Sequence, residues 1–130
     1  MDEHRQRELR DRHPTILGRI HVDCGNGWFD VIDVLCDELE RQAEWAKQAP
    51  PRAIQVKEKF GGLRFYTDRS NDVYFALTQL AESMSFRVCE DCGNPGQLRP
   101  GIVISTLCSA CFERHRGKQR KWNVIDDWDL

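Results

Sequence analysis

The chain has 130 residues, of which 40% are hydrophobic and 31% are charged, and its formal net charge is −2. A chain of this size buries one modest core, which excludes a second large domain, and this charge argues against a polyanion-binding field over the whole molecule. The start is charged rather than apolar and no run reaches eighteen apolar residues, so we expect a cytoplasmic protein with no membrane partner.

A charged N-terminal segment covers residues 1–13. Residues 1–12 carry almost no apolar side chain, so we expect a solvated helix that ends before Pro14, or a segment without fixed structure. Ile16, Ile20 and Val22 then predict a short strand at the edge of a sheet. The glycines of Gly25-Asn26-Gly27 predict a turn.

A helix is predicted from residue 28 to about residue 47, just before two prolines. Apolar residues repeat there at about 100° per residue and indicate the core face: Phe29, Ile32, Leu35, Cys36, Leu39 and Ala43. An acidic stripe follows on the adjoining arc and is expected to be a solvated flank: Asp30, Asp33, Asp37, Glu40 and Glu44. Cys36 is expected to be a buried hydrophobe, whereas the sequence assigns no role to Cys24.

A β-hairpin is predicted over residues 53–68. Two alternating runs flank Gly61-Gly62, and such a pair is typical of a two-residue hairpin turn. This turn sets Phe60 opposite Leu63 and Lys59 opposite Arg64. The predicted core face then carries Val56, Phe60, Leu63 and Phe65. The opposite face carries four candidate binding residues, Lys57, Lys59, Arg64 and Tyr66.

The candidate binding face of the hairpin is cationic. Two like charges directly opposite each other destabilise a sheet unless solvent or an anion lies between them, so this face indicates an acidic partner. Glu58 points to the core side, where an unpaired carboxylate is costly. We expect it either to protect an exposed sheet edge or to have a specific buried partner.

A second helix is predicted from about residue 73 to residue 86, with Asn71 or Asp72 as its N-cap. The apolar residues at helical spacing predict its buried face: Val73, Ala76, Leu77, Leu80 and Met84. With the preceding elements this gives an α+β core over residues 14–86, arranged as helix, β-hairpin and helix.

Two Cys-x2-Cys pairs give the most specific signal in the chain. Fifteen residues separate the pairs, and this spacing is typical of a tetrahedral zinc site. The four predicted ligands are Cys89, Cys92, Cys108 and Cys111. Two thiolate pairs fill the shell of a structural Zn²⁺, while an iron–sulfur cluster and redox dithiols are the alternatives.

The surroundings of the cysteines predict a small zinc module over residues 87–121. The first pair forms a knuckle with Gly93, two apolar runs around Pro100-Gly101 indicate a hairpin, and the second pair begins a helix. This order resembles a treble-clef zinc finger. His115, four residues after Cys111, is an additional candidate as a ligand or as a hydrogen-bond partner of one.

The end of the module is basic. Five cations there are candidate phosphate contacts, although a solvated helix end gives the same pattern: Arg114, Arg116, Lys118, Arg120 and Lys121. An acidic tail, residues 122–130, follows, and its aspartates offer an internal neutralising partner.

Two motifs carry a family resemblance. The stretch from Cys24 to Asp33, with Cys-Gly-Asn-Gly-Trp at its start, precedes a second stretch from Gln55 to Tyr66 with the sequence QVKEKFGGLRFY. Together with the cysteine pairs, they resemble a family of small uncharacterised phage and prophage proteins over about residues 15–115. The resemblance implies a phage-related accessory protein and no activity at particular residues. Members of this family often have histidine in place of Cys111, which supports that position as a ligand.

Three functions follow as hypotheses. The first is a non-enzymatic binding protein, stabilised by structural zinc, that engages a host protein or nucleoprotein complex, with its oligomeric state left open. The second is a nucleic-acid-binding protein that uses the basic helix 114–121 and the hairpin face. The third is a treble-clef nuclease. Because residues 93–107 contain no histidine, aspartate or glutamate for general base catalysis, we expect no enzyme.

Overall fold

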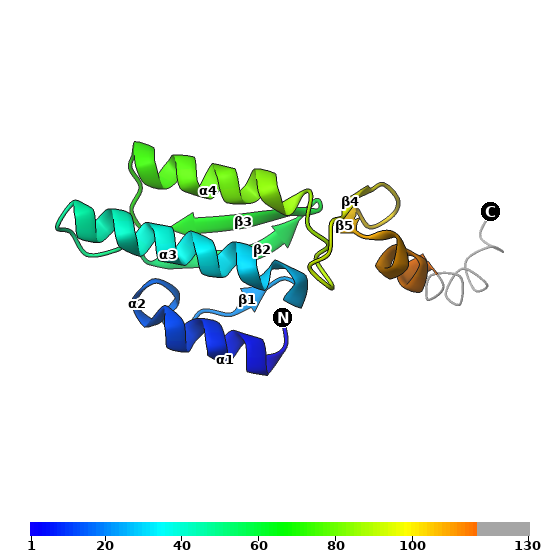
Figure 1. Cartoon of the computed structure of the whole chain (residues 1–130), viewed down its shortest axis with the longest axis horizontal. Coiled ribbons are helices and arrows are strands. Elements are labelled where there is room, and N and C mark those ends of the chain that lie inside the picture. The colour runs from blue at the N-terminus through cyan, green and yellow to red at the C-terminus, as the bar shows by residue number, and fades with distance from the viewer. Residues whose placement is uncertain (117–130) are drawn as a thin grey trace.

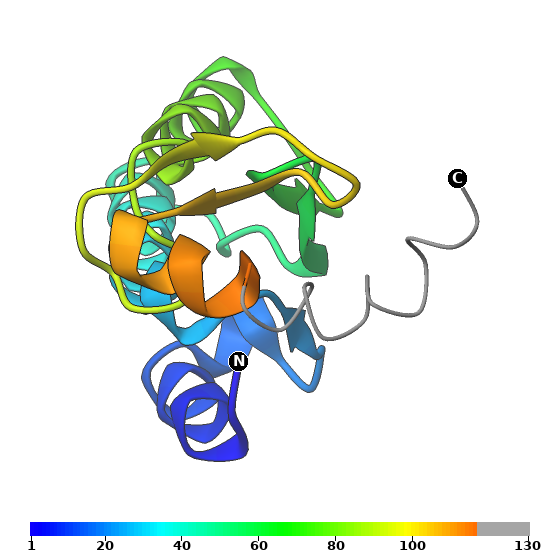
Figure 2. The same ribbon diagram turned by 90° about the vertical axis from the view of Figure 1, so that its right-hand side faces the viewer.

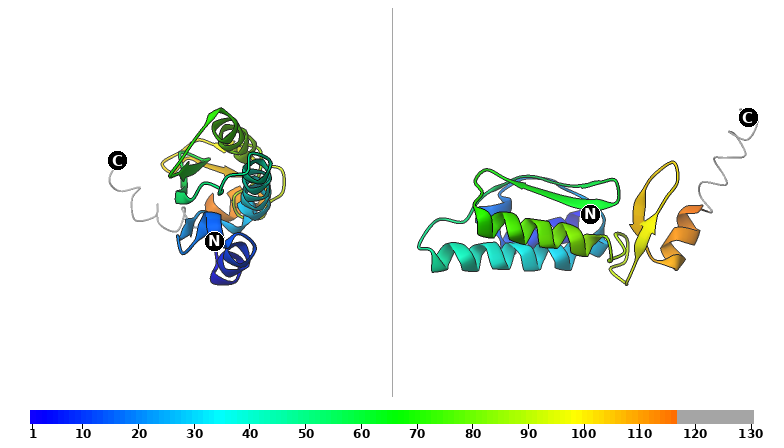
Figure 3. Two further views of the ribbon diagram at one scale, coloured as in Figure 1. Left: turned by 90° about the vertical axis from the view of Figure 1, so that its left-hand side faces the viewer. Right: turned by 90° about the horizontal axis from the view of Figure 1, so that it is seen from above.

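Two helices cover one face of a small sheet, and a two-stranded hairpin with its own helix closes one end of the molecule (Figures 1 and 3). The computed structural model describes residues 1–116. Its helical elements are α1 (Glu3–Arg12), α2 (Pro14–Leu17), the 3-10 turn η1 (Asn26–Trp28), α3 (Phe29–Trp45) and α4 (Asp72–Ser85). Its strands are β1 (Val22–Asp23), β2 (Ala53–Lys59), β3 (Gly62–Thr67), β4 (Gln97–Arg99) and β5 (Ser105–Leu107).

The fold is the predicted α+β arrangement of helix, hairpin and helix, followed by the cysteine module. The chain is again helical over residues 109–116, directly after Cys108. Across residues 1–116, the helices are all too short or too polar to traverse a lipid bilayer.

The N-terminal segment is helical and packs against the core, so the expectation of a solvated segment is wrong. Leu9 is completely buried, and so is Gln6, whose side-chain oxygen accepts a hydrogen bond of 2.9 Å from the backbone N–H of Val22. The guanidinium of Arg5 lies 4.8 Å from the ring centroid of Phe29 on α3. Polar side chains with specific partners therefore complete a buried face that contains a single leucine.

The main sheet has the strand order β1-β2-β3, with β1 parallel to β2 and β3 antiparallel to it. The predicted edge strand is shorter than expected: Val22 lies in β1 and pairs with Val56, whereas Ile16 belongs to α2 and Ile20 lies between the two elements. Because β2 lies in the middle of the sheet, Glu58 does not protect an edge, and that expectation is wrong. Its carboxylate instead accepts a hydrogen bond of 2.8 Å from the backbone N–H of Gly61.

The hairpin turn lies one residue earlier than predicted, so residues 55–59 of β2 each pair with a residue two positions earlier in β3 than expected. Phe60 and Gly61 form the turn, each with a positive φ, and Lys59 pairs with Gly62. Lys57 therefore lies opposite Arg64, and the predicted pairing of Lys59 with Arg64 is wrong. Gly62 belongs to the strand because the ring of Phe86 fills the space next to it: a Cβ there would lie 2.4 Å from Phe86 Cζ.

The long helix α3 buries the predicted face, whereas α4 does not. Asn71 caps α4 as predicted, since its side chain accepts a hydrogen bond from the Tyr74 N–H. The buried residues of α4, however, are Tyr74, Ala81 and Ser85. Small residues bring the helix close to β3, where the Ser85 hydroxyl oxygen accepts a hydrogen bond of 2.9 Å from the N–H of Leu63. Most of the predicted face is exposed, including Leu80 at 58% and Met84 at 49%.

Candidate metal centre

Four cysteine side chains meet in the module that contains β4 and β5. This module is the end of the molecule that faces the viewer in Figure 2. The Sγ atoms of Cys89, Cys92, Cys108 and Cys111 all lie within 4.8 Å of one another, and those of Cys92 and Cys108 are 3.6 Å apart. Zn–S bonds of about 2.3 Å in a tetrahedron give sulfur–sulfur edges of about 3.8 Å. The cluster can therefore hold a metal ion, and both its ligand type and its dimensions suit zinc.

The first pair lies on a tight turn of the backbone. The N–H of Gly93 donates to the carbonyl of Cys89 at 2.9 Å, and Gly93 has a φ of +82°, which glycine adopts without strain. The carbonyl of Asn94 accepts a hydrogen bond of 2.7 Å from the N–H of Cys89. These bonds form the predicted knuckle and direct both sulfurs to one side.

The second pair belongs to the start of the helical residues 109–116. The N–H of Cys111 lies 3.4 Å from the sulfur of Cys108, one helical turn earlier. This hydrogen bond lowers the pKa of Cys108 to about 7, whereas burial and the neighbouring thiols raise the pKa of Cys111 to about 12. All four cysteines can therefore be thiolates together only when a cation lies between them. Metal binding supplies this cation as the metal displaces the thiol protons.

The other predicted residues around the cysteines have different roles. His115 is not part of the cluster, because its Nε2 lies 2.6 Å from the carboxylate of Asp91. Arg114 donates to the Cys111 sulfur at 2.8 Å, and Arg116 lies 3.9 Å from Glu113. Three further predicted cations lie outside the described residues, as does the acidic tail 122–130: Lys118, Arg120 and Lys121.

The knuckle packs against the loop that carries the Cys-Gly-Asn-Gly-Trp motif. The Gly27 N–H donates to the carbonyl of Glu90 at 2.7 Å, and the indole N–H of Trp28 donates to the carbonyl of Val88 at 2.8 Å. A Cβ on Gly27 would lie 2.0 Å from the carbonyl oxygen of Cys89. The motif therefore joins the cysteine module to the core through close backbone contact, and glycine permits that approach.

The module also packs against the turn between β2 and β3. The buried hydroxyl of Thr106 on β5 donates to the carbonyl of Gly61 at 2.6 Å. A Cβ on Gly61 would lie 2.4 Å from the side chain of Leu98 on β4. Both glycine-containing motifs of the sequence therefore contact the module.

The predicted binding face of the hairpin is only partly available. Lys57, Lys59, Arg64 and Tyr66 share one face, as expected, because Lys57 pairs with Arg64. The Arg64 guanidinium, however, forms an ion pair with Glu82 on α4. Lys59 is exposed and lies 5.7 Å from the ring centroid of the exposed Phe60, and Tyr66 is 44% exposed.

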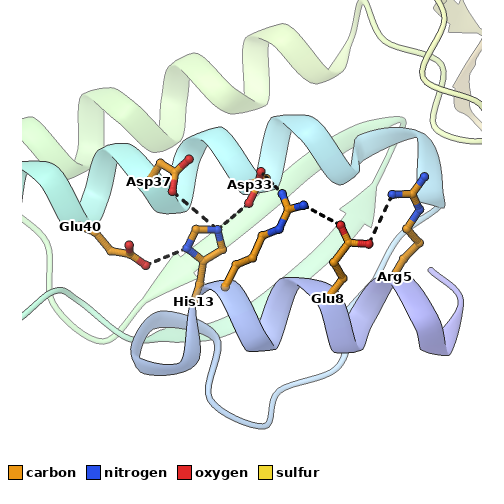
Figure 4. A network of polar contacts seen from close by, with 7 residues as sticks. Arg5, Glu8, His13, Asp33, Asp37 and Glu40 are labelled. Atoms are coloured by element: carbon orange, nitrogen blue, oxygen red, sulfur yellow. Dashed lines mark hydrogen bonds and ion pairs between the residues drawn. The ribbon is translucent and has the colours of Figure 1, made fainter.

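Sequence reasoning missed a polar network around His13, which Figure 4 shows. His13 is 1% exposed, and its two ring nitrogens lie 2.6 Å from Asp33 and 2.8 Å from Glu40 on α3. Burial lowers the pKa of His13, but hydrogen bonds to both carboxylates outweigh it and hold the pKa above its usual value. Arg12 donates to the other oxygen of Asp33 at 2.8 Å.

This network corrects the view of the acidic stripe as a solvated flank at Asp33 and Glu40, whereas Asp30, Asp37 and Glu44 are exposed as expected. Asp33 and Glu40 are part of an interface, and Asp37 lies 3.9 Å from the same imidazole. The signal available in the sequence was the i, i+4, i+7 spacing of these three acids beside a helix-terminating His-Pro pair.

The two remaining cysteines lie outside the metal cluster. Cys36 is completely buried among apolar residues of the core, as predicted. Cys24 is 6% exposed and lies in the Cys-Gly-Asn-Gly-Trp loop, against which the knuckle packs. Burial raises the pKa of both thiols, to about 12 for Cys24, so both remain protonated at neutral pH. All six cysteines of residues 1–116 are free of disulfide bonds.

Comparison of the chain with protein-family models, with curated proteins and with solved structures finds no match.

Proposed function

We propose that this chain is a binding protein without enzymatic activity, and that its cysteine centre holds structural zinc. The observation that carries the proposal is the closed arrangement of the four sulfurs, all within 4.8 Å of one another. Four thiolates complete the tetrahedral shell of Zn²⁺ and leave no position for a substrate or an activated water. The ion then contributes to folding rather than to a reaction.

The position of the centre supports a structural role. The knuckle contributes two sulfurs, and Cys108 and Cys111, at the start of the C-terminal helical residues, contribute the other two. The module contacts the core at Gly27 and at Gly61. Zinc therefore fixes the exposed β4–β5 hairpin and the β2–β3 turn relative to each other. Side chains near these two tips are exposed, with Ile102 at 94% and Phe60 at 64%.

The partner that we propose is a host protein or nucleoprotein complex, as expected for a phage-type accessory factor. This part rests on the resemblance of the glycine motifs and on the exposed apolar side chains, because solvent-exposed apolar surface is typical of protein interfaces. Nucleic acid is the second candidate, favoured by Lys59, Phe60 and Tyr66, which are exposed together at one hairpin.

The test is purification of the full chain under metal-free buffer conditions, with zinc measured by mass spectrometry and nucleic acid by absorbance. We expect one zinc per chain. Cys89→Ser should lose the zinc and the stability of the module, whereas the matched control Cys36→Ser, a buried cysteine outside the centre, should retain the metal.

Binding is tested by capture from host lysate with the same preparations. A specific protein partner that the Cys36→Ser chain retains and the Cys89→Ser chain loses supports the proposal. Binding to labelled DNA or RNA that falls steeply between about 50 and 200 mM salt supports the nucleic-acid alternative. A Cys89→Ser chain with unchanged stability and zinc content contradicts the structural role, and turnover of a substrate contradicts the absence of enzymatic activity.

A further inference from the structure

An apolar groove runs between the exposed sides of α3 and α4, which lie side by side in Figures 1 and 3. It encloses about 290 Å³, and nearly all of its lining is apolar. Val34 on α3, at 59% exposure, forms one wall, and Leu80 and Met84 on α4, at 58% and 49%, form the other. Val88 and Gly93, next to the knuckle, close one end.

The spacing of the lining residues fits a helical partner. On α3 the lining positions are 31, 34, 35 and 38, with Asp30 beside them, and on α4 they are 77, 80, 81 and 84. Both sets follow the spacing i, i+3, i+4, i+7, which spans about 10 Å along a helix. A third helix laid between the two would meet them with an apolar stripe of the same period, which is how amphipathic helices bind grooves.

The charge around the groove specifies the flanks of that helix. Together, α3 and α4 carry eight carboxylates and one arginine. Asp33 and Glu40 face His13, and Glu82 pairs with Arg64, so those three are already occupied. Within the described part of the chain, the groove lining contains Asp30 and Glu38 and neither lysine nor arginine. Glu38 pairs with Arg41, whereas Asp30 has no ion pair in residues 1–116.

We propose that this groove binds an amphipathic helix of a partner protein whose apolar stripe is flanked by lysine or arginine. The inference rests on the proposed function as a binding protein and names the surface and the partner chemistry. The apolar walls supply most of the affinity, because they become buried. The acidic helices favour a cationic partner over an anionic one and over a second copy of this chain, whose groove would bring like charges together.

The test is a titration of a fluorescein-labelled 18-residue peptide with leucines at helical spacing and lysines on its flanks, followed by fluorescence anisotropy with the full zinc-loaded chain. A matched peptide with glutamate in place of lysine is the charge control. We expect the lysine peptide to bind at least tenfold more tightly than the glutamate peptide at 50 mM salt. Circular dichroism should show the lysine peptide becoming helical.

Three variants and one control locate the binding surface. Leu80→Asp and Val34→Asp, on opposite walls, should each weaken the lysine peptide at least tenfold. Ile54→Asp on β2 is the matched control, because it makes the same kind of change at a 61% exposed apolar residue outside the groove. Asp30→Asn should reduce the preference for the lysine peptide and leave the fold unchanged. Melting temperature and zinc content report whether each variant is folded.

Several results would overturn the inference. They are equal weakening by Ile54→Asp and Leu80→Asp, equal binding of the two peptides, and a chain that sediments as a dimer which Leu80→Asp dissociates. If lysate capture yields a partner that Leu80→Asp and Val34→Asp do not release, the groove assignment fails while the proposed binding function stands. If no partner is captured but the lysine peptide binds in the groove, the proposed function fails separately.

Discussion

Replacement of His13 by glutamine should remove a buried cationic link between the N-terminal helix and α3. The imidazole lies 2.6 Å from Asp33 and 2.8 Å from Glu40, and each such hydrogen bond to a charged group contributes about 1.5–3 kcal/mol. Glutamine can restore one of the two bonds as a neutral donor. We therefore expect His13→Gln to lower the free energy of unfolding by about 1.5–3 kcal/mol near pH 6.

The stability that His13 contributes should decrease as the pH rises. The folded-state pKa of His13 is raised above the ordinary value of 6.5, since Asp33 and Glu40 stabilise the protonated ring. The stabilisation is therefore complete below about pH 6.5 and is lost as the pH rises through the folded-state pKa. In that window the stability difference between wild type and variant should shrink by at most about 1.4 kcal/mol per pH unit.

The assay is urea unfolding of both zinc-saturated chains between pH 5.5 and pH 9. Because other groups also titrate, the informative quantity is the difference between the two chains at each pH. His4→Gln is the matched control, since the His4 side chain is 85% exposed; this variant should follow the wild type. A stability difference that is the same at every pH, or one that grows as the pH rises, would refute the assignment of His13 as a buried cation.

Three further substitutions test individual contacts that stabilise the fold. Gly27→Ala would place a Cβ 2.0 Å from the carbonyl oxygen of Cys89. It should therefore lower both the melting temperature and the zinc affinity, which is measured by competition with a chromophoric chelator. An unchanged zinc affinity would show that this contact does not influence metal binding. Thr106→Val leaves the buried Gly61 carbonyl without its 2.6 Å donor and should cost about 1–3 kcal/mol by urea unfolding, whereas Thr106→Ser should retain most of that stability. Asn71→Ala removes the N-cap of α4 and should cost about 1 kcal/mol, while Asn71→Asp, which still accepts from the Tyr74 N–H, should cost little; equal losses in both would contradict the capping role.

The metal cluster was predictable because its signal is local. The signal consists of two Cys-x2-Cys pairs, a glycine after the first pair and a helix-forming run after the second. All of these features lie within a few residues of the cysteines themselves. The long helix α3 was equally clear, since the apolar residues of its predicted core face repeat over the element and all of that face is buried.

The hairpin register was not predictable, because it depends on contacts distant in sequence. The Gly61-Gly62 pair suggests the turn, but the Phe86 ring needs the space beside Gly62 and the Glu58 carboxylate binds the N–H of Gly61. These contacts move the turn one residue towards the N-terminus, onto Phe60. Local turn preference therefore gave way to tertiary packing.

The orientation of α4 and the packing of α1 were missed for a related reason. On α4 the stronger apolar stripe faces the groove, and the weaker face, with Ala81 and Ser85, approaches the sheet because it is small. On α1 one leucine and the polar residues Gln6 and His13 make the interface. A hydrophobic pattern cannot identify a face that is buried through hydrogen bonds.

With zinc bound as proposed, the contact between the knuckle and the Cys-Gly-Asn-Gly-Trp loop would also link zinc supply to the amount of native protein. Because the backbone at Gly27 and the indole of Trp28 are bonded to the knuckle, the centre and the core should unfold together. Each tenfold rise in free zinc above the dissociation constant would then add about 1.4 kcal/mol to the stability of the whole chain. A cell that withholds zinc would thereby lower the concentration of active protein without any change in its synthesis.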